Sequence, residues 1–186
     1  MSNAQLGEQL VGAYHKMISE CEIVSYNQRS PEAGEQMEID VIGIKTDNDQ
    51  QTIYVCEVIT HLHGMRYSGS PSTTEWEEYG NDMYQHTLER IYRKFQSDLG
   101  YAIEVFDRAD KYVFQLWSPV VPQGGLTDGL DALKRRFENS YDHELELIIN
   151  SQYSTEISKL QELASKEKKQ YGEPAFRFLQ ILGHMR

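Results

Sequence analysis

The 186-residue sequence predicts one α/β domain in which helices cover a mixed β-sheet. Two patterns support this class. Apolar residues recur at helical spacing over residues 5–20 and 81–106, which is typical of amphipathic helices. By contrast, residues 37–60 hold two β-branched runs joined by the polar turn Thr46–Asp49. Taken in order, the chain is expected to fold as α-β-β-β-α-β-α-β-α-α.

Residues that begin or end helices divide the rest of the chain. Gly100 is expected to end or kink the helix over 81–106, and Pro174 suits the first turn of a last helix. Thr127 or Asp128 is expected to cap an earlier helix. The remaining elements are strands over 22–26, 111–121 and 144–150 and helices over 127–139, 155–171 and from Pro174 onward.

Composition limits the classes of protein that fit. A hydrophobic content of 39% with 25% charged residues is typical of a soluble globular domain, and no apolar run approaches the roughly 20 residues that cross a bilayer. We therefore expect a cytoplasmic protein with Cys21 and Cys56 as buried free thiols. The formal charge of −11 disfavours non-specific nucleic-acid binding, which needs Lys and Arg, but it does not exclude a nuclease.

Two carboxylates lie inside the β-branched runs instead of at their ends. Asp40 stands in EIDVIGI and Glu57 in YVCEVIT. A buried carboxylate is costly unless it is paired, hydrogen-bonded or bound to a metal. If the hairpin sets Asp40 beside Glu57, the two offer hard oxygen ligands to Mg²⁺ or Mn²⁺. Backbone donors or arginines could satisfy them instead, and the sequence leaves both interpretations open.

Other polar residues are weaker candidates for a site. Glu8 is a first-turn acid that the helix dipole favours. His61 and His63 follow the Glu57 strand and are more typical of a polar loop than of a transition-metal site. The polar side of the helix over 81–106 is basic, which indicates either a solvated face or a nucleic-acid contact. The basic run 134–136 near a helix C-terminus is favoured there by the helix dipole.

The order of elements and the acids together resemble the PD-(D/E)xK, or restriction-endonuclease-like, nucleases. The three-layer core of that family runs α-β-β-β-α-β, with an acid on the first helix, an Asp on the second strand and Glu-x-Lys on the third. Glu8, Asp40 and Glu57 occupy those places in that order. The resemblance covers about residues 5–121 of a single domain over 1–186, and residues 122–186 form a C-terminal extension.

One position departs from the family pattern. Ile59 stands where the Glu-x-Lys lysine is expected, and isoleucine cannot activate water or offset phosphate charge. Some members of the family place the lysine on the following helix, which makes Lys94 the candidate. Lys45 is weaker, because strand alternation turns it to the opposite face from Asp40. Alternatively, the catalytic centre has lapsed.

The resemblance implies a Mg²⁺- or Mn²⁺-dependent nuclease that hydrolyses phosphodiester bonds in DNA. Asp40, Glu57 and Glu8 would be the metal ligands, and Lys94 would supply positive charge near the phosphate. The expected partner is DNA, and pairing into a homodimer is left open. The nucleic-acid backbone would be contacted by Arg66, Arg90 and Arg93.

Two rival functions follow from the same residues. The first is a catalytically lapsed module of the same fold that binds nucleic acid or a protein partner. The second is an enzyme that uses His61 and His63 as a metal or acid–base centre on an unrelated substrate. This second rival leaves the positions of Asp40 and Glu57 inside their strands unexplained.

Overall fold

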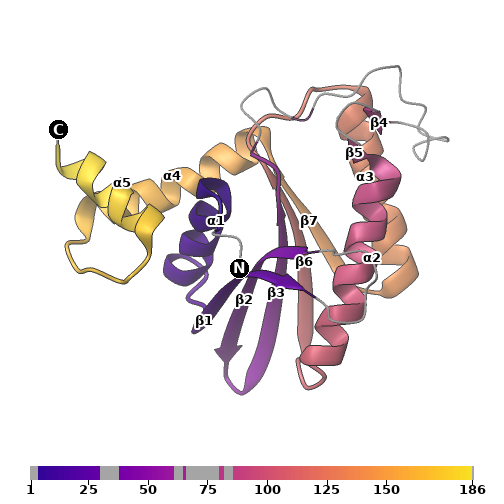
Figure 1. The fold of residues 1–186 in the computed structure, drawn as a ribbon, viewed down its shortest axis with the longest axis horizontal. Coiled ribbons are helices and arrows are strands. Elements are labelled where there is room, and N and C mark those ends of the chain that lie inside the picture. The colour runs from indigo at the N-terminus through magenta and orange to yellow at the C-terminus, as the bar shows by residue number, and fades with distance from the viewer. Residues whose placement is uncertain (1–3, 30–37, 61–64, 66–79, 82–85, 186) are drawn as a thin grey trace.

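The computed structural model describes residues 4–29, 38–60, 65, 80–81 and 86–185, which form five helices around a five-stranded mixed sheet (Figure 1). The α/β class is therefore confirmed, and the order of elements is the expected one apart from an added pair of two-residue strands. The elements are α1 (Leu6–Met17), β1 (Ile23–Arg29), β2 (Glu38–Asp47), β3 (Gln50–Val58), β4 (Gly80–Asn81), β5 (His86–Thr87), α2 (Leu88–Val105), β6 (Lys111–Ser118), α3 (Gly125–Tyr141), β7 (Glu144–Ile149), α4 (Asn150–Lys166) and α5 (Pro174–His184).

The five-stranded sheet has the order β1-β2-β3-β6-β7. Strands β1, β2 and β3 form an antiparallel meander, whereas β3, β6 and β7 are parallel. The β2–β3 turn needs two residues with positive φ, and Asn48 and Asp49 supply them with φ of 49° and 64°. Helices α2 and α3 provide the crossovers that parallel strands require.

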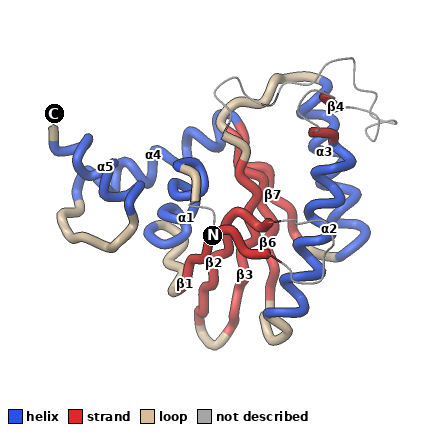
Figure 2. Tube along the Cα trace, in the orientation of Figure 1, coloured by secondary structure: helices blue, strands red, loops and turns tan. Residues whose placement is uncertain are grey.

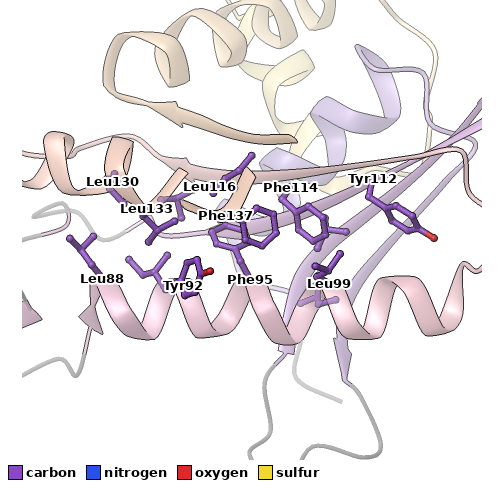
Figure 3. Packing of buried hydrophobic residues seen from close by; sticks show 14 of the residues in the cluster. Leu88, Tyr92, Phe95, Leu99, Tyr112, Phe114, Leu116, Leu130, Leu133 and Phe137 are labelled. Atoms are coloured by element: carbon purple, nitrogen blue, oxygen red, sulfur yellow. The ribbon is translucent and has the colours of Figure 1, made fainter. Parts of the chain in front are cut away.

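The helices form a layer on each face of the sheet. Helices α1, α4 and α5 lie on one side, and α2 and α3 lie on the other (Figures 1 and 2). The larger core fills the space under α2 and α3 (Figure 3). Within it the ring centroid of Phe137 lies 5.9 Å from that of Phe95 and 5.0 Å from that of Phe114.

A smaller core under α1 contains buried polar groups as well as apolar ones. His15 Nε2 lies 2.9 Å from Gln115 Oε1 and 3.2 Å from Cys56 Sγ, and Trp117 donates to the same Gln115 oxygen. Burial lowers the pKa of His15 to about 4, so this imidazole is neutral at physiological pH. Cys21 and Cys56 are buried free thiols, as expected.

Several element boundaries differ from those expected. The second helix begins at Leu88, not at residue 81, and runs through Gly100 to Val105. The strand over 111–121 ends at Ser118, because Pro119 cannot continue it. The first strand runs on to Arg29, and α3 begins two residues before the expected Thr127 cap.

Helix α4 is displaced at both ends, since it starts and ends five residues before the expected positions. Asn150 adopts a positive φ of 51° directly after β7, and its side-chain amide exchanges two hydrogen bonds with the backbone of Val121. These tertiary bonds set the start of the helix. Its end at Lys166, before Tyr171, accompanies bonds from the Gln180 amide to two carbonyls of the following loop. No helix of the described residues is long and apolar enough to cross a membrane.

Replacing Phe137 by alanine should destabilise the protein by about 3–5 kcal/mol, because the change leaves a cavity beside the rings of Phe95 and Phe114. Denaturant unfolding measures the loss as a lower midpoint at unchanged slope. Ile103→Ala is the control, because Ile103 is exposed on α2 and its truncation should cost less than about 1 kcal/mol. Equal losses in the two variants would contradict this account of the core.

Candidate acidic site between the hairpin and helix α2

The β2–β3 register brings the two strand carboxylates together. Val41 pairs with Cys56, so the next position of the same register sets Asp40 opposite Glu57. Directly opposed residues of an antiparallel pair share a face. Asp40 Oδ2 also accepts the backbone N–H of Val58 at 2.7 Å, which fixes its side chain across the hairpin. The sequence left this register open, and in the structure Asp40 lies opposite Glu57.

Lys94 of α2 joins these two carboxylates from the helix above them. Its ammonium forms an ion pair with Glu57, lies 3.8 Å from Asp40 Oδ1 and donates to the Glu38 carbonyl at 2.8 Å. The lysine that the sequence singled out on this helix therefore meets both acids. The arrangement also answers part of the open question about the acids, because their partners are a lysine and a backbone N–H and include no arginine among the described contacts.

A third carboxylate, Asp98, completes this cluster and was missed from the sequence. It lies one helical turn after Lys94, is only 1% exposed and hydrogen-bonds to Glu57 through its side chain. One signal was present, since Asp98 stands between Phe95 and Leu99 on the apolar side of α2. We call Asp40, Glu57, Lys94 and Asp98 the acidic centre.

The electrostatics of the acidic centre show an excess of negative charge. Burial and the neighbouring Asp98 raise the pKa of Glu57 well above its ordinary range, although Lys94 opposes the shift. Burial also raises the pKa of Asp98, to about 7, and that of Asp40. For Lys94, burial lowers the pKa, but the three carboxylates outweigh it and the net shift is upward. The centre therefore holds a charged ammonium and retains a proton among its carboxyls near neutral pH.

Glu8 lies near the acidic centre and is hydrogen-bonded at the end of its own helix. An ideal Cβ on Gly7 would fall 2.3 Å from Thr60 Oγ1, so only glycine lets α1 pack this closely against the end of β3. Glu8 is thereby buried beside that strand end, and its carboxylate accepts the N–H of Gln5 at 2.8 Å. Burial raises its pKa, and Asp40 raises it further. Glu8 is thus a buried helix-capping acid.

The position that departs from the family pattern is part of the core. Ile59 packs against the large core under α2 and α3. Thr60, one residue later, contacts Gly7 of α1 on the opposite side, in keeping with strand alternation. Ile59 therefore has apolar neighbours. The positive charge at the acidic centre is that of Lys94.

The basic residues proposed to contact nucleic acid are only partly described. Arg66 lies outside the described residues, as do His61 and His63, the pair considered for the rival enzyme. Arg93 forms an exposed ion pair with Glu89 at 2.5 Å, and Arg90 is exposed on the same helix, four residues before Lys94. Within the run 134–136, Lys134 donates to the Leu145 carbonyl and Arg136 lies over the ring of Tyr92, in keeping with a structural role.

Whether a divalent cation fits can be tested on the donor atoms. Mg²⁺ usually takes one or two protein carboxylates and completes its six oxygen ligands with water and phosphate. Asp40 and Glu57 provide such a pair, and in the described part of the chain Glu57 Oε1 and Asp98 Oδ2 are buried without a hydrogen-bond partner. These residues therefore fit a two-carboxylate site.

A three-carboxylate ligand set is not assembled. Among the residues that the structure describes, no group of three or more His, Cys, Asp or Glu side chains could hold a metal ion. The Glu8 carboxylate accepts a hydrogen bond at its own helix end, and its part as a third ligand beside Asp40 and Glu57 stays a prediction. Comparisons with protein-family models, with curated proteins and with solved structures find no match to this chain.

Replacing Lys94 by methionine should destabilise the protein by about 1–3 kcal/mol near pH 8, because it leaves the buried Glu57 carboxylate without its cation. The cost should be smaller in a Glu57→Gln background, because only Asp40 and Asp98 then remain for the ammonium to neutralise. Denaturant unfolding of the wild type, Lys94→Met, Glu57→Gln and the double variant completes this double-mutant cycle. Lys111→Met removes an exposed ion pair with Glu144 and should cost no more than about 1 kcal/mol. An undiminished cost of Lys94→Met in the Glu57→Gln background would contradict the pairing.

Replacing Asp98 by asparagine should make stability less dependent on pH. Because the pKa of Asp98 rises from 3.8 to about 7 on folding, the folded protein binds a proton that the unfolded chain releases. The stabilisation of the folded protein by this proton is complete below about pH 4 and is lost as the pH rises through about 7. Relative to the wild type, Asp98→Asn should therefore gain on the order of 4 kcal/mol of unfolding free energy over this window, because the shift spans about three pKa units. Parallel curves of unfolding free energy against pH would refute this.

Proposed function

We propose that this protein is a metal-dependent nuclease that hydrolyses phosphodiester bonds in DNA. The observation that carries the proposal is the meeting of Asp40, Glu57 and Lys94, which come from two strands and the following helix. Two hard carboxylate donors beside one ammonium suit a phosphodiester and its cation. The α-β-β-β-α-β order and the change from antiparallel to parallel strands at β3 also support a restriction-endonuclease-like fold.

The residues of the acidic centre have distinct parts in this proposal. Asp40 and Glu57 would hold Mg²⁺ or Mn²⁺, and the bound ion would polarise the phosphodiester and lower the pKa of a water. The Val58 N–H keeps Asp40 in place, and the Asp98 side chain is hydrogen-bonded to Glu57. Lys94 and Asp40 are the partly exposed members, so the centre opens to solvent on their side. There the Lys94 ammonium would face the negative charge that develops on phosphate.

A catalytically lapsed module of the same fold is the second candidate, and one observation favours it. The Lys94 ammonium already neutralises Glu57, as a structural ion pair would. Such a module would bind nucleic acid or a protein partner without using the acids chemically. It predicts that divalent cations do not bind at the acidic centre and that DNA is not cleaved.

Calorimetric titration with Mn²⁺, together with cleavage assays on plasmid and single-stranded DNA, separates the two candidates. For a nuclease, Asp40→Asn should weaken Mn²⁺ binding by about tenfold or more and lower the cleavage rate by about 100-fold or more. Lys94→Met should retain Mn²⁺ binding and lose a similar factor in cleavage, because the lysine acts on phosphate charge.

Asp131→Asn is the matched control, since it removes an exposed carboxylate of α3 away from the acidic centre. It should change neither Mn²⁺ binding nor cleavage. If Mn²⁺ binds the wild type and Asp40→Asn equally, the metal assignment is wrong. If the wild type binds no Mn²⁺ and cleaves neither substrate, the lapsed module becomes the better account.

A further inference from the structure

Helix α5 is apolar on both of its faces. Its inner face packs on α1 and α4 through Ala175 and Phe176, and Gly183 lies against Ser165 of α4. The buried Gln180 amide donates to the carbonyls of Glu167 and Lys169, so the helix is held in one orientation against the domain. A helix that is hydrophobic all round is normally covered on all sides.

The outer face of α5 carries four large apolar side chains that the described residues leave exposed. Phe178 is 52% exposed, Ile181 48%, Leu182 44% and Met185, at the C-cap, 75%. They follow the spacing i, i+3, i+4 and i+7, which places them on one stripe over two helical turns. We call these four residues the α5 stripe.

The area of the α5 stripe suits pairing with an identical surface. With roughly half of each ~200 Å² side chain exposed, the stripe offers on the order of 400 Å² of apolar surface, and two copies offer about 800 Å². A standard interface buries about 1,600 Å² in total, of which somewhat more than half is apolar. The α5 stripe alone would therefore supply nearly all the apolar part of such an interface.

The charges around the α5 stripe also fit the centre of an interface. Interface cores are depleted of charged residues, whereas their rims are polar. Arg177 and His184 are the ionisable side chains exposed along α5, and they flank the two ends of the stripe. The middle, formed by Ile181 and Leu182, carries no charge.

We propose that the α5 stripe is the contact surface of a two-fold homodimer of this chain. A two-fold axis lets the same patch serve both copies, as is usual for soluble oligomers, so no second complementary patch is needed. Each stripe packs its Ile181 and Leu182 against those of the other copy at the centre of the interface. The proposal is independent of the function assigned to the acidic centre.

The position of α5 determines what the dimer leaves open. Helices α5 and α2 lie at opposite ends of the molecule, with the sheet between them (Figure 1). Pairing through α5 therefore leaves the acidic centre, which α2 helps to form, uncovered in both copies.

Sedimentation velocity over a wide concentration range tests the dimer. The wild type should sediment as a dimer that dissociates on dilution, and Ile181→Glu should raise the dissociation constant by about 30-fold or more, because it buries a charge at the centre of the contact. Leu182→Glu should act in the same way. Circular dichroism of each variant checks that the fold is retained, which is expected because both side chains point away from the core.

Ile103→Glu is the matched control. Ile103 is 45% exposed, much like Ile181, but it lies on α2, and its replacement should leave the dimer unchanged. A wild type that stays monomeric at every concentration overturns the proposal, as does a dimer that Ile181→Glu and Leu182→Glu do not weaken. A monomer that instead floats with phosphatidylserine vesicles also overturns it and makes the stripe a membrane-docking surface.

Discussion

The ion pair between Lys94 and Glu57 is the interaction on which the rest of the site depends. It joins the middle of the sheet to helix α2 and neutralises a carboxylate that is almost fully buried. Three carboxyls and one ammonium share this small volume. When two of the three carboxyls are ionised, the centre therefore carries one negative charge more than its ammonium can neutralise. A buried group in that state either keeps a proton or attracts a cation. The raised pKa values of Glu57 and Asp98 correspond to the retained proton, and the proposed metal site corresponds to the bound cation.

The large core makes this arrangement rigid. Phe95 and Leu99, the neighbours of Lys94 and Asp98 along α2, are buried against the sheet and α3. Their packing fixes the rotation of the helix, and that rotation turns Lys94 and Asp98 toward the hairpin (Figure 3 shows the core side of α2). On the opposite face, the close approach of α1 at Gly7 brings Glu8 to the same strand end. The polar centre is thus bordered by apolar packing on both faces of the sheet.

The two ends of the molecule differ in character. The end with α2 presents the acidic centre to solvent through Lys94 and Asp40, whereas the end with α5 presents an apolar stripe. The segment after β6 contributes to both ends of the molecule. Helix α3 and strand β7 extend the large core and the sheet, and helices α4 and α5 build the second helical layer with α1. This segment is therefore built into the fold as fully as the first 121 residues.

The sequence by itself determined the order of elements and the hairpin, because strand alternation and turn chemistry are local properties that a single chain segment carries. It also singled out Lys94. The hairpin register that sets Asp40 opposite Glu57 came from the structure. Only the tertiary structure decided that Asp98 belongs to the centre, that Glu8 caps its own helix, and where α4 begins and ends. These outcomes depend on the rotation of one helix against a sheet and on bonds such as those of Asn150 and Gln180 to distant backbone, and such contacts leave no periodic signal in the sequence.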